Sequence, residues 1–238
     1  MQWRNRAQRP QEMSCRKALL EMHRKGAITL PELTRSYAFR DACRINVPPP
    51  IATVCCSLEE LGKVELVRVT TGPLSALWRG MLDEHHYLKS GPLCGAQLRY
   101  LAHSECFGWI GGLSFSACAR RVEKRDAWIG WTEEARCQNH ILLINNSRFL
   151  IPPMVKVKNL ASHLLGMAQK RLADDWEAAY QYRPVMLETY IERGRFAGTS
   201  YRAANWQYVG TTAGLGRQGT GASINDIYVI SLLPEWRL

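Results

Sequence analysis

One stretch of this chain, from Ile141 to Gly210, constrains the fold more than any other. It begins with the apolar strand pattern ILLINNSRFLI and passes through a Pro-Pro turn into VKNLAS, which is typical of a helix start. A long amphipathic helix follows from Leu160 to Trp176, then the strand pattern VMLETYI and a turn that carries Tyr201. This order recurs in folds that bind a nucleotide-bearing cofactor. The stretch therefore predicts a sheet with an anion-binding helix start beside it.

The segments on either side of this stretch complete a single domain from residue 64 to residue 238. Their hydrophobic periodicity predicts further strands and one more helix. RDAWIGW predicts a further short strand or a packed turn. The sum is an α/β (α+β) domain with a mixed, mostly antiparallel central sheet flanked by helices. The other expected elements are strands at ELVRV, 96–102, 107–116, 207–211 and IYVISLL, and a helix over 74–88.

Residues 1–45 predict a small basic helical segment, and residues 46–63, with three consecutive prolines, predict a linker. Ser14 is a candidate helix cap, Gly26 stands where a helix usually ends, and the apolar run 27–30 predicts a short strand. A helix and strand at this spacing are typical of part of a winged helix-turn-helix, and a helical hairpin packed on the main domain fits equally well. In the winged-helix interpretation, the residues that contact nucleic-acid phosphate are Arg16, Lys17, Arg24 and Lys25.

Positive charge is concentrated near the two ends of the chain. The net charge is +10, and residues 1–44 contain ten Lys and Arg against four Asp and Glu. The segment 193–225 contains four arginines and no acidic residue, and Arg217 lies in its glycine-rich loop. A basic surface attracts polyanions, so this distribution favours a surface that faces DNA, with ordinary solubility as the alternative.

The composition also bounds the location of the protein. No run of about 18 apolar residues occurs, so the sequence predicts no membrane-spanning helix and no membrane partner. The basic first residues lack the apolar core of a secretory signal, and the eight cysteines include no CxxC pair. We expect a cytoplasmic protein.

Several separate motifs, in order, resemble one known family. The chain is similar to the domain found in DruA of the Druantia anti-phage defence system and in relatives linked to transposable elements. The resemblance implies a role in defence against foreign DNA or in mobile-element biology, beside other subunits that include a large helicase-like protein. The motifs that carry it are MSCRKALLEMHRKG, AQLRYLAH, RDAWIGW, NNSRFLI, VKNLASHLLGMAQKRLADDW, LETYIERGRFAGTSYRAANW and VGTTAGLGRQG.

A more distant resemblance concerns the fold. The strand order is similar to that of the GNAT superfamily of acyl-CoA-dependent N-acetyltransferases, in which a turn of pattern Gln/Arg-x-x-Gly-x-Gly/Ala holds the cofactor pyrophosphate. Here Asn159 replaces the first glycine, and its side chain tolerates the left-handed backbone but crowds the pyrophosphate position. No cofactor is required by the sequence; the resemblance allows acetyl-CoA or another acyl-CoA. The corresponding residues are Lys156, Val157, Lys158, Asn159, Leu160, Ala161 and Ser162.

The same resemblance assigns catalytic roles to two residues. Tyr201 stands where these acetyltransferases often have a Tyr that protonates the departing thiolate, with Asn205 in place of a following glycine. Glu188, on the preceding strand, alternates out of the apolar set and would face a cleft, where a carboxylate takes a proton from an amine. The alternatives are a core Tyr201 bonded to backbone, and a Glu188 paired with Arg148 or Arg202.

The sequence predicts no metal site, because the nearest set, Glu133, Glu134, Cys137 and His140, has no second cluster at zinc-finger spacing. Three function classes stay open. The first is a defence or transposition component that acts on or near nucleic acid through its basic surface. The second is an acyl-CoA-dependent N-acyltransferase. The third is a protein-interaction subunit without a ligand.

Overall fold

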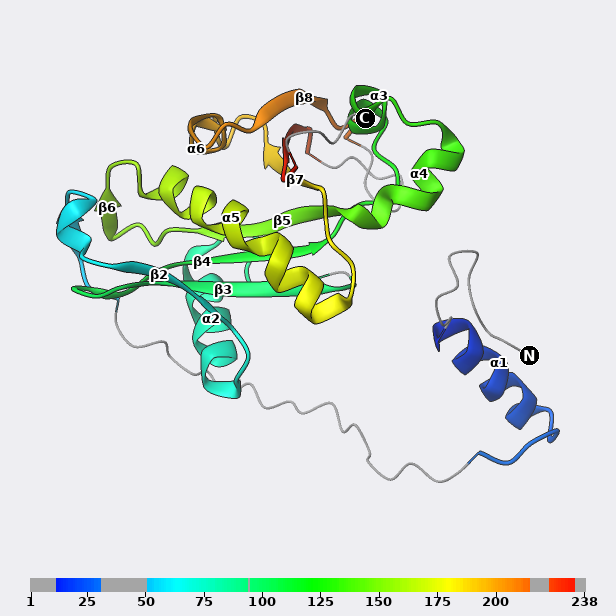
Figure 1. Cartoon of the computed structure of the whole chain (residues 1–238). Helices are drawn as coiled ribbons and strands as arrows, with labels where there is room; N and C mark the ends of the chain where they lie inside the picture. Colours follow the sequence, from blue (N-terminus) through cyan, green and yellow to red (C-terminus); the bar gives the residue numbers. More distant parts are fainter. Residues whose placement is uncertain (1–11, 31–50, 94, 215–222, 234–238) are drawn as a thin grey trace. The chain divides into compact units, whose positions relative to one another are not determined.

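The computed structural model describes residues 12–30, 51–93, 95–214 and 223–233. By its internal contacts the chain divides into two units, residues 1–44 and residues 45–238. The smaller unit contributes one described helix, α1 (Glu12–Arg24), and the larger unit contains every described strand (Figure 1). None of the described helices is both long and apolar enough to cross a bilayer.

The larger unit is built on a seven-stranded sheet with the order β2-β3-β4-β5-β7-β9-β8. Every neighbouring pair is antiparallel except β5 and β7, which run parallel. This mixed, mostly antiparallel sheet with flanking helices is the fold class that the sequence predicts. Its strands are β2 (Val64–Arg68), β3 (Gln97–Ser104), β4 (Gly108–Ala117), β5 (Leu143–Leu150), β7 (Met186–Glu192), β8 (Gln207–Thr211) and β9 (Asn225–Ser231).

Helix α5 (Leu160–Tyr180) covers one face of the sheet (Figure 1). Its apolar residues recur at helical spacing and are buried against strand residues such as Tyr100 and Phe115. This helix was predicted from the same stripe, and the structure extends it by one turn to Tyr180. The buried stripe consists of Leu160, Leu164, Leu165, Ala168, Leu172 and Trp176.

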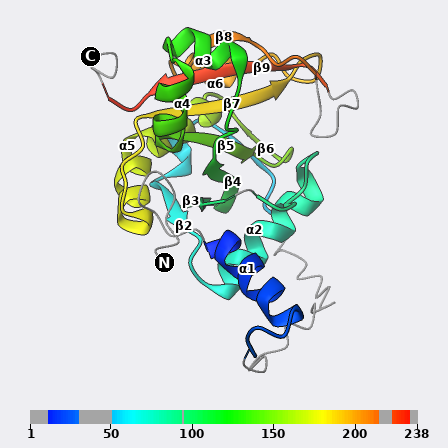
Figure 2. The same ribbon diagram turned by 90° about the vertical axis from the view of Figure 1, so that its right-hand side faces the viewer.

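Two helices cover the opposite face. Successive strand residues point to opposite faces, and Leu101, next to Tyr100, packs under α2 (Gly72–His85). Helix α3 (Glu123–Ile129) covers β7 and β9 on this face, and its Trp128 packs in the same cluster as Leu143. Figure 2 shows α3 beside β8. The remaining elements are α4 (Glu133–Asn139), α6 (Thr199–Ala203), β6 (Val155–Val157) and β1 (Val54–Cys56).

The structure corrects the interpretation of RDAWIGW. These residues form most of α3 and not a strand, and the helix ends at Gly130, which adopts a left-handed φ of 85°. Arg125 and Asp126 of this helix are buried and ion-paired, Arg125 with both Asp126 and Glu188.

The limits of the expected linker are also wrong. Residues 54–56 form β1, which pairs in parallel with β6, and a 3-10 turn follows at Glu59–Leu61. Val54 and Leu61 are 1% and 0% exposed and belong to the core of the larger unit. Residues 54–63 are therefore part of the folded sheet domain, because their apolar side chains are needed to close one end of the core.

Residues 12–30, the described part of the N-terminal segment, contain one helix and no strand. Ser14 lies inside α1 and is not its cap, and Gly26 follows the helix with a φ of 71°, as expected for a terminating glycine. Residues 28–30 form no strand, so within residues 12–30 there is a helix without the predicted wing.

Two adjacent glycines of β4 provide a test of how closely the strands approach. A Cβ built on Gly111 would lie 2.8 Å from the backbone oxygen of Leu150, whereas one on Gly112 meets only side-chain atoms at 3.5 Å or more. Since backbone cannot give way as a side chain can, Gly111→Ala should lower the free energy of unfolding by about 1–3 kcal/mol. Gly112→Ala is the control and should cost clearly less. Urea denaturation of both variants checks this, and equal losses would contradict it.

Candidate functional site

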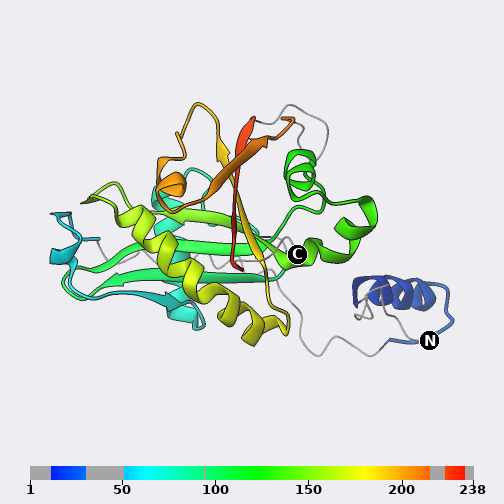
Figure 3. The same cartoon turned by 45° about the horizontal axis from the view of Figure 1, so that its top comes forward.

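The parallel strands β5 and β7 pair over only three residues. Residues 143–145 pair with residues 186–188, after which no further pairing joins the two strands although both continue. Figure 3 shows the β7, β9 and β8 part of the sheet inclined to the β2–β5 part. A cavity of about 550 Å³ lies where the strands diverge. Its walls come from residues 85–88 after α2, 146–151 of β5, 189–191 of β7 and 195–201 before and within α6.

Asn146 lies where the strands diverge, and its carbonyl bonds β7 while its side chain bonds β4 and β5. Its Nδ2 donates to the carbonyl oxygens of Ser114 (3.0 Å) and Arg148 (3.1 Å). Its own carbonyl accepts a hydrogen bond from Thr189 Oγ1 at 3.1 Å, so a side chain of β7 satisfies the group that a strand partner would otherwise bind. The Asn146 side chain is 4% exposed, and these bonds fix the width of the opening.

Tyr201 lies in the cavity wall, on helix α6. Its hydroxyl donates to Oδ1 of Asn146 at 2.6 Å. Burial raises the pKa of the Tyr201 hydroxyl, so the phenol keeps its proton near neutral pH. The sequence predicted a tyrosine that holds a proton beside a cleft, and the partner of this hydroxyl is a side-chain amide and not backbone.

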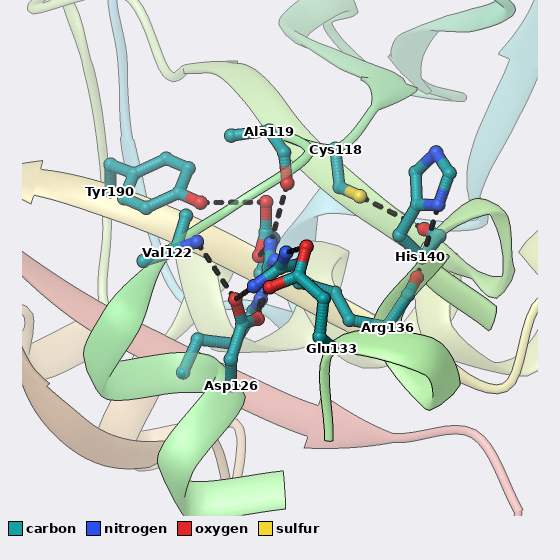
Figure 4. A network of polar contacts seen from close by, with 10 residues as sticks. Cys118, Ala119, Val122, Asp126, Glu133, Arg136, His140 and Tyr190 are labelled. Atoms are coloured by element: carbon teal, nitrogen blue, oxygen red, sulfur yellow. Dashed lines mark hydrogen bonds and ion pairs between the residues drawn. The ribbon is translucent and has the colours of Figure 1, made fainter. Parts of the chain in front are cut away.

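Glu188 does not face the cavity. Its carboxylate is 0% exposed, accepts a hydrogen bond from Tyr190 Oη at 2.7 Å and pairs with Arg125 Nη1 at 2.7 Å. Arg125 also contacts Asp126 and the carbonyl of Ala119, and Figure 4 shows Asp126, Tyr190 and Ala119 around this network. The expectation of a carboxylate facing the cleft is therefore wrong. The pairing alternative was right in kind, but the partner is Arg125 and not Arg148 or Arg202.

The predicted cofactor segment contains the expected helix start at Leu160, and its first two residues belong to β6, a strand that the sequence pattern did not predict. Asn159 has a left-handed φ of 65° directly before α5, and Asn205 has the same value. Both asparagines at the glycine positions thus adopt the backbone that favours glycine. Only Ala161 of this segment lines the cavity. Lys156 and Val157 lie in β6, and Lys158 follows it. The side chains of Lys156, Lys158 and Asn159 are exposed, whereas Leu160 is buried. The Ser162 hydroxyl donates a hydrogen bond to the Asn159 carbonyl.

Aromatic and cationic side chains form the rim of the cavity. The Arg195 guanidinium lies 4.6 Å from the ring centroid of Tyr87, and the Tyr87 ring lies 5.5 Å from Phe196 and stacks on His86 at 5.0 Å. Tyr87 and Phe196 are 38% and 51% exposed. We call Tyr87, Arg195 and Phe196 the aromatic rim. The sequence pattern gave no sign of it, because its residues come from two loops with no periodicity.

Arg148 supplies the other cation of the cavity. Its Nε donates to the carbonyl of Lys89 at 2.8 Å and its Nη1 to that of Ser147 at 2.7 Å. Within the described residues it forms no ion pair, since no salt bridge includes it. Burial, and then the charge of Arg148, lowers the pKa of His86 to about 4. His86 is therefore neutral near pH 7, in agreement with its Nδ1 accepting the Leu88 N–H at 3.1 Å.

The predicted nucleic-acid residues lie apart from this cavity in the sequence. Lys17, Arg24 and Lys25 are exposed on or just after α1, and Lys25 pairs with Glu21 at 2.8 Å. Arg16 belongs to α1, but its side chain is outside the described part, and Arg217 lies outside the described residues. Among the described residues no group of three or more His, Cys, Asp or Glu side chains is placed to hold a metal ion.

The fold and site define an α/β domain with a seven-stranded main sheet and a ligand-sized cavity between two diverging parallel strands. The model of the family described as Druantia protein DruA matches residues 21–229, which is most of the chain. The chain belongs to this DruA family. None of the curated proteins compared matches it.

Solved structures of acetyltransferases are similar to this chain at low identity. A spermidine N-acetyltransferase from Vibrio cholerae, in complex with CoA and spermine, is 10% identical, with 71% of this chain and 95% of that chain covered at a TM-score of 0.46. A protein described as an acetyltransferase from Acinetobacter baylyi is 11% identical, with 71% and 92% covered at a TM-score of 0.48. An N-acetyltransferase from Staphylococcus aureus is 16% identical, with 58% and 68% covered at 0.36.

The role of Glu188 can be tested through stability. Glu188→Gln leaves the Arg125 charge buried without its main partner and should lower the free energy of unfolding by about 3–5 kcal/mol. The control is Glu65→Gln, which removes an exposed pair with Lys63 and should change stability little, because solvent screens such pairs. Chemical denaturation measures both, and a Glu188→Gln variant as stable as the parent would contradict a structural role.

Proposed function

We propose that this protein serves anti-phage defence by acting on or near nucleic acid through a basic surface, with its sheet domain as the scaffold. Membership in the DruA family implies the defence role. The observation that carries the nucleic-acid role is the concentration of charge: residues 1–44 contain ten Lys and Arg against four Asp and Glu in a chain of net charge +10. Cations that neutralise phosphates release counterions, which supplies affinity without any sequence preference.

Two features of the described residues agree with this proposal. Lys17, Arg24 and Lys25 are exposed on or beside α1, so phosphate can reach them without a change of fold. The cavity of the sheet domain is lined by Arg148 and Arg195 and by no Asp or Glu in the described part of the chain. The partners that fit this role are DNA and other subunits of the defence system, including a helicase-like protein.

DNA binding by the full chain tests the proposal. Fluorescence anisotropy with a short labelled duplex should give an affinity that falls at least about tenfold from about 50 to about 200 mM salt. Reversal of Arg16, Lys17, Arg24 and Lys25 to Glu should remove most of the binding. If the duplex does not bind, or if its affinity does not change with salt, the proposal is wrong.

The control reverses the same number of charges on the sheet domain. Arg120, Arg121, Lys124 and Lys170 are exposed there, and their replacement by Glu changes the net charge equally. This variant should keep most of the affinity. If both variants lose the same amount, net charge alone explains the binding, and the assignment to the N-terminal segment is wrong.

A second candidate is an acyl-CoA-dependent N-acyltransferase, and one observation favours it. The cavity lies between diverging strands, next to Ala161 at the start of α5 and to the protonated hydroxyl of Tyr201. The helix start offers amide N–H groups to a phosphate, and Tyr201 could supply a proton to a thiolate. The enclosure of Glu188 removes the expected base, so an amine would have to arrive without its proton or lose it to water.

Acetyl-CoA separates this candidate from the first. A ligand of the folded state raises the melting temperature by mass action, so millimolar acetyl-CoA should shift the thermal transition upward if the cavity binds it. Tyr201→Phe should keep that shift and slow acetyl transfer to a polyamine or peptide amine. An unchanged transition counts heavily against an acyltransferase. If neither DNA nor acetyl-CoA binds, the remaining class is a protein-interaction subunit.

A further inference from the structure

The charge of Arg148 is the feature of the cavity that most needs a partner. Arg148 is half-buried, and its guanidinium donates hydrogen bonds to two backbone carbonyls, which orient Nε and Nη1 without supplying a negative charge. Burial lowers the pKa of Arg148, which expresses the cost of keeping the charge away from water. No carboxylate of the described residues pairs with this charge, so an anion that enters the cavity would supply the missing counterion.

The surroundings of Arg148 favour an anionic ligand more strongly still. No described residue that lines the cavity is acidic. The second cation, Arg195, already pairs with Glu192 at 3.0 Å and is held over Tyr87, so its charge is partly compensated. His86 is neutral, and because its Nδ1 accepts the Leu88 N–H, its Nε2 is the protonated nitrogen and can donate a hydrogen bond. The anion therefore meets Arg148 as its main charge partner, with neutral polar groups around it.

The aromatic rim indicates what else the ligand contains. Tyr87 and Phe196 expose large parts of their rings to solvent, and the Arg195 guanidinium is stacked on Tyr87. Exposed aromatic rings beside arginines are the platform on which proteins stack unpaired bases, because every base has a flat face. A small inorganic anion would gain nothing from these rings. A phosphate attached to a flat heterocycle would gain from both.

The size of the cavity limits the ligand to a single unit. Its volume of about 550 Å³ lies within the range of small-molecule pockets, about 300–1,000 Å³. One nucleotide fits this space, whereas a base pair with its two backbones does not. The base must therefore be unpaired when it enters.

We propose that the cavity binds one unpaired nucleotide of a single-stranded nucleic acid, with its phosphate against Arg148 and its base against the aromatic rim. This inference rests on the proposed function, since a nucleic-acid strand is the source of the nucleotide. It adds a site in the sheet domain, apart from the basic residues of α1, that distinguishes single strands from duplex.

The experiment compares strands and variants in the full chain. A labelled single-stranded 12-mer and a duplex of the same sequence are titrated against the parent and Arg148→Gln. The parent should bind the single strand more tightly than the duplex. Arg148→Gln should lower single-strand affinity about tenfold and change duplex affinity by less than about twofold, because one charge-assisted phosphate contact is lost at one site.

Two further variants control for folding and for net charge. Arg183→Gln removes an exposed arginine that pairs with Asp174 and Glu177 and should leave both affinities unchanged. Tyr87→Ala with Phe196→Ala removes exposed rings and should also lower single-strand affinity about tenfold. These ring variants keep the inference testable if Arg148→Gln does not fold, which its thermal transition reveals.

The outcomes separate the inference from the proposed function. Equal affinity for the two strands, with no effect of Arg148→Gln, overturns the cavity site while the α1 reversal still tests DNA binding. If adenosine monophosphate binds only when Arg148 is present and no single strand binds, the ligand is a free nucleotide, and the proposal that the nucleotide belongs to a nucleic-acid strand is wrong. Acetyl-CoA that binds in the same Arg148-dependent way, again without single-strand binding, overturns the inference in favour of the acyltransferase.

Discussion

The parting of β5 and β7 after three paired residues is the constraint on which the rest of the larger unit depends. Strands that diverge leave backbone groups without ladder partners, and an unpaired buried carbonyl is costly. At the open end Thr189 and Tyr201 satisfy the carbonyl and the side chain of Asn146. At the closed end Glu188 binds Arg125 of α3, which ties the helix to β7. Polar contacts from three elements thus hold the cavity open.

These contacts bury the carboxylate of Glu188 and leave the arginines and the Tyr201 phenol at the cavity. The carboxylate nearest the strand junction, Glu188, is enclosed by Arg125 and Tyr190, so its charge stabilises the fold. The cavity keeps a phenol with a raised pKa and two arginines. Two arginines and a protonated phenol, with no carboxylate in the described lining, are well suited to holding an anion.

The sequence predicts well what depends on local periodicity and poorly what depends on distant partners. The stripe from Leu160 to Trp176 specifies α5 because each of its apolar residues falls on one helical face. The left-handed backbone at Asn159 and Asn205 agrees with the tolerance of asparagine for that conformation at positions where the acetyltransferase pattern has glycine. The partner of Glu188 lies 63 positions earlier, in a helix of seven residues. The hydrophobic periodicity of the sequence does not predict an ion pair between residues so far apart.

The aromatic rim and Arg148 could not be predicted from sequence periodicity either. Tyr87 follows a helix, Arg148 lies on a strand, and Arg195 and Phe196 lie in a loop, so only the divergence of β5 and β7 brings them to one cavity. Each would be an ordinary surface residue on a flat sheet. Arg148 contacts two carbonyls and, in the described chain, no carboxylate, so its half-buried charge lowers the stability of the free protein. An anion bound beside Arg148 would offset that cost, as the proposed nucleotide site requires.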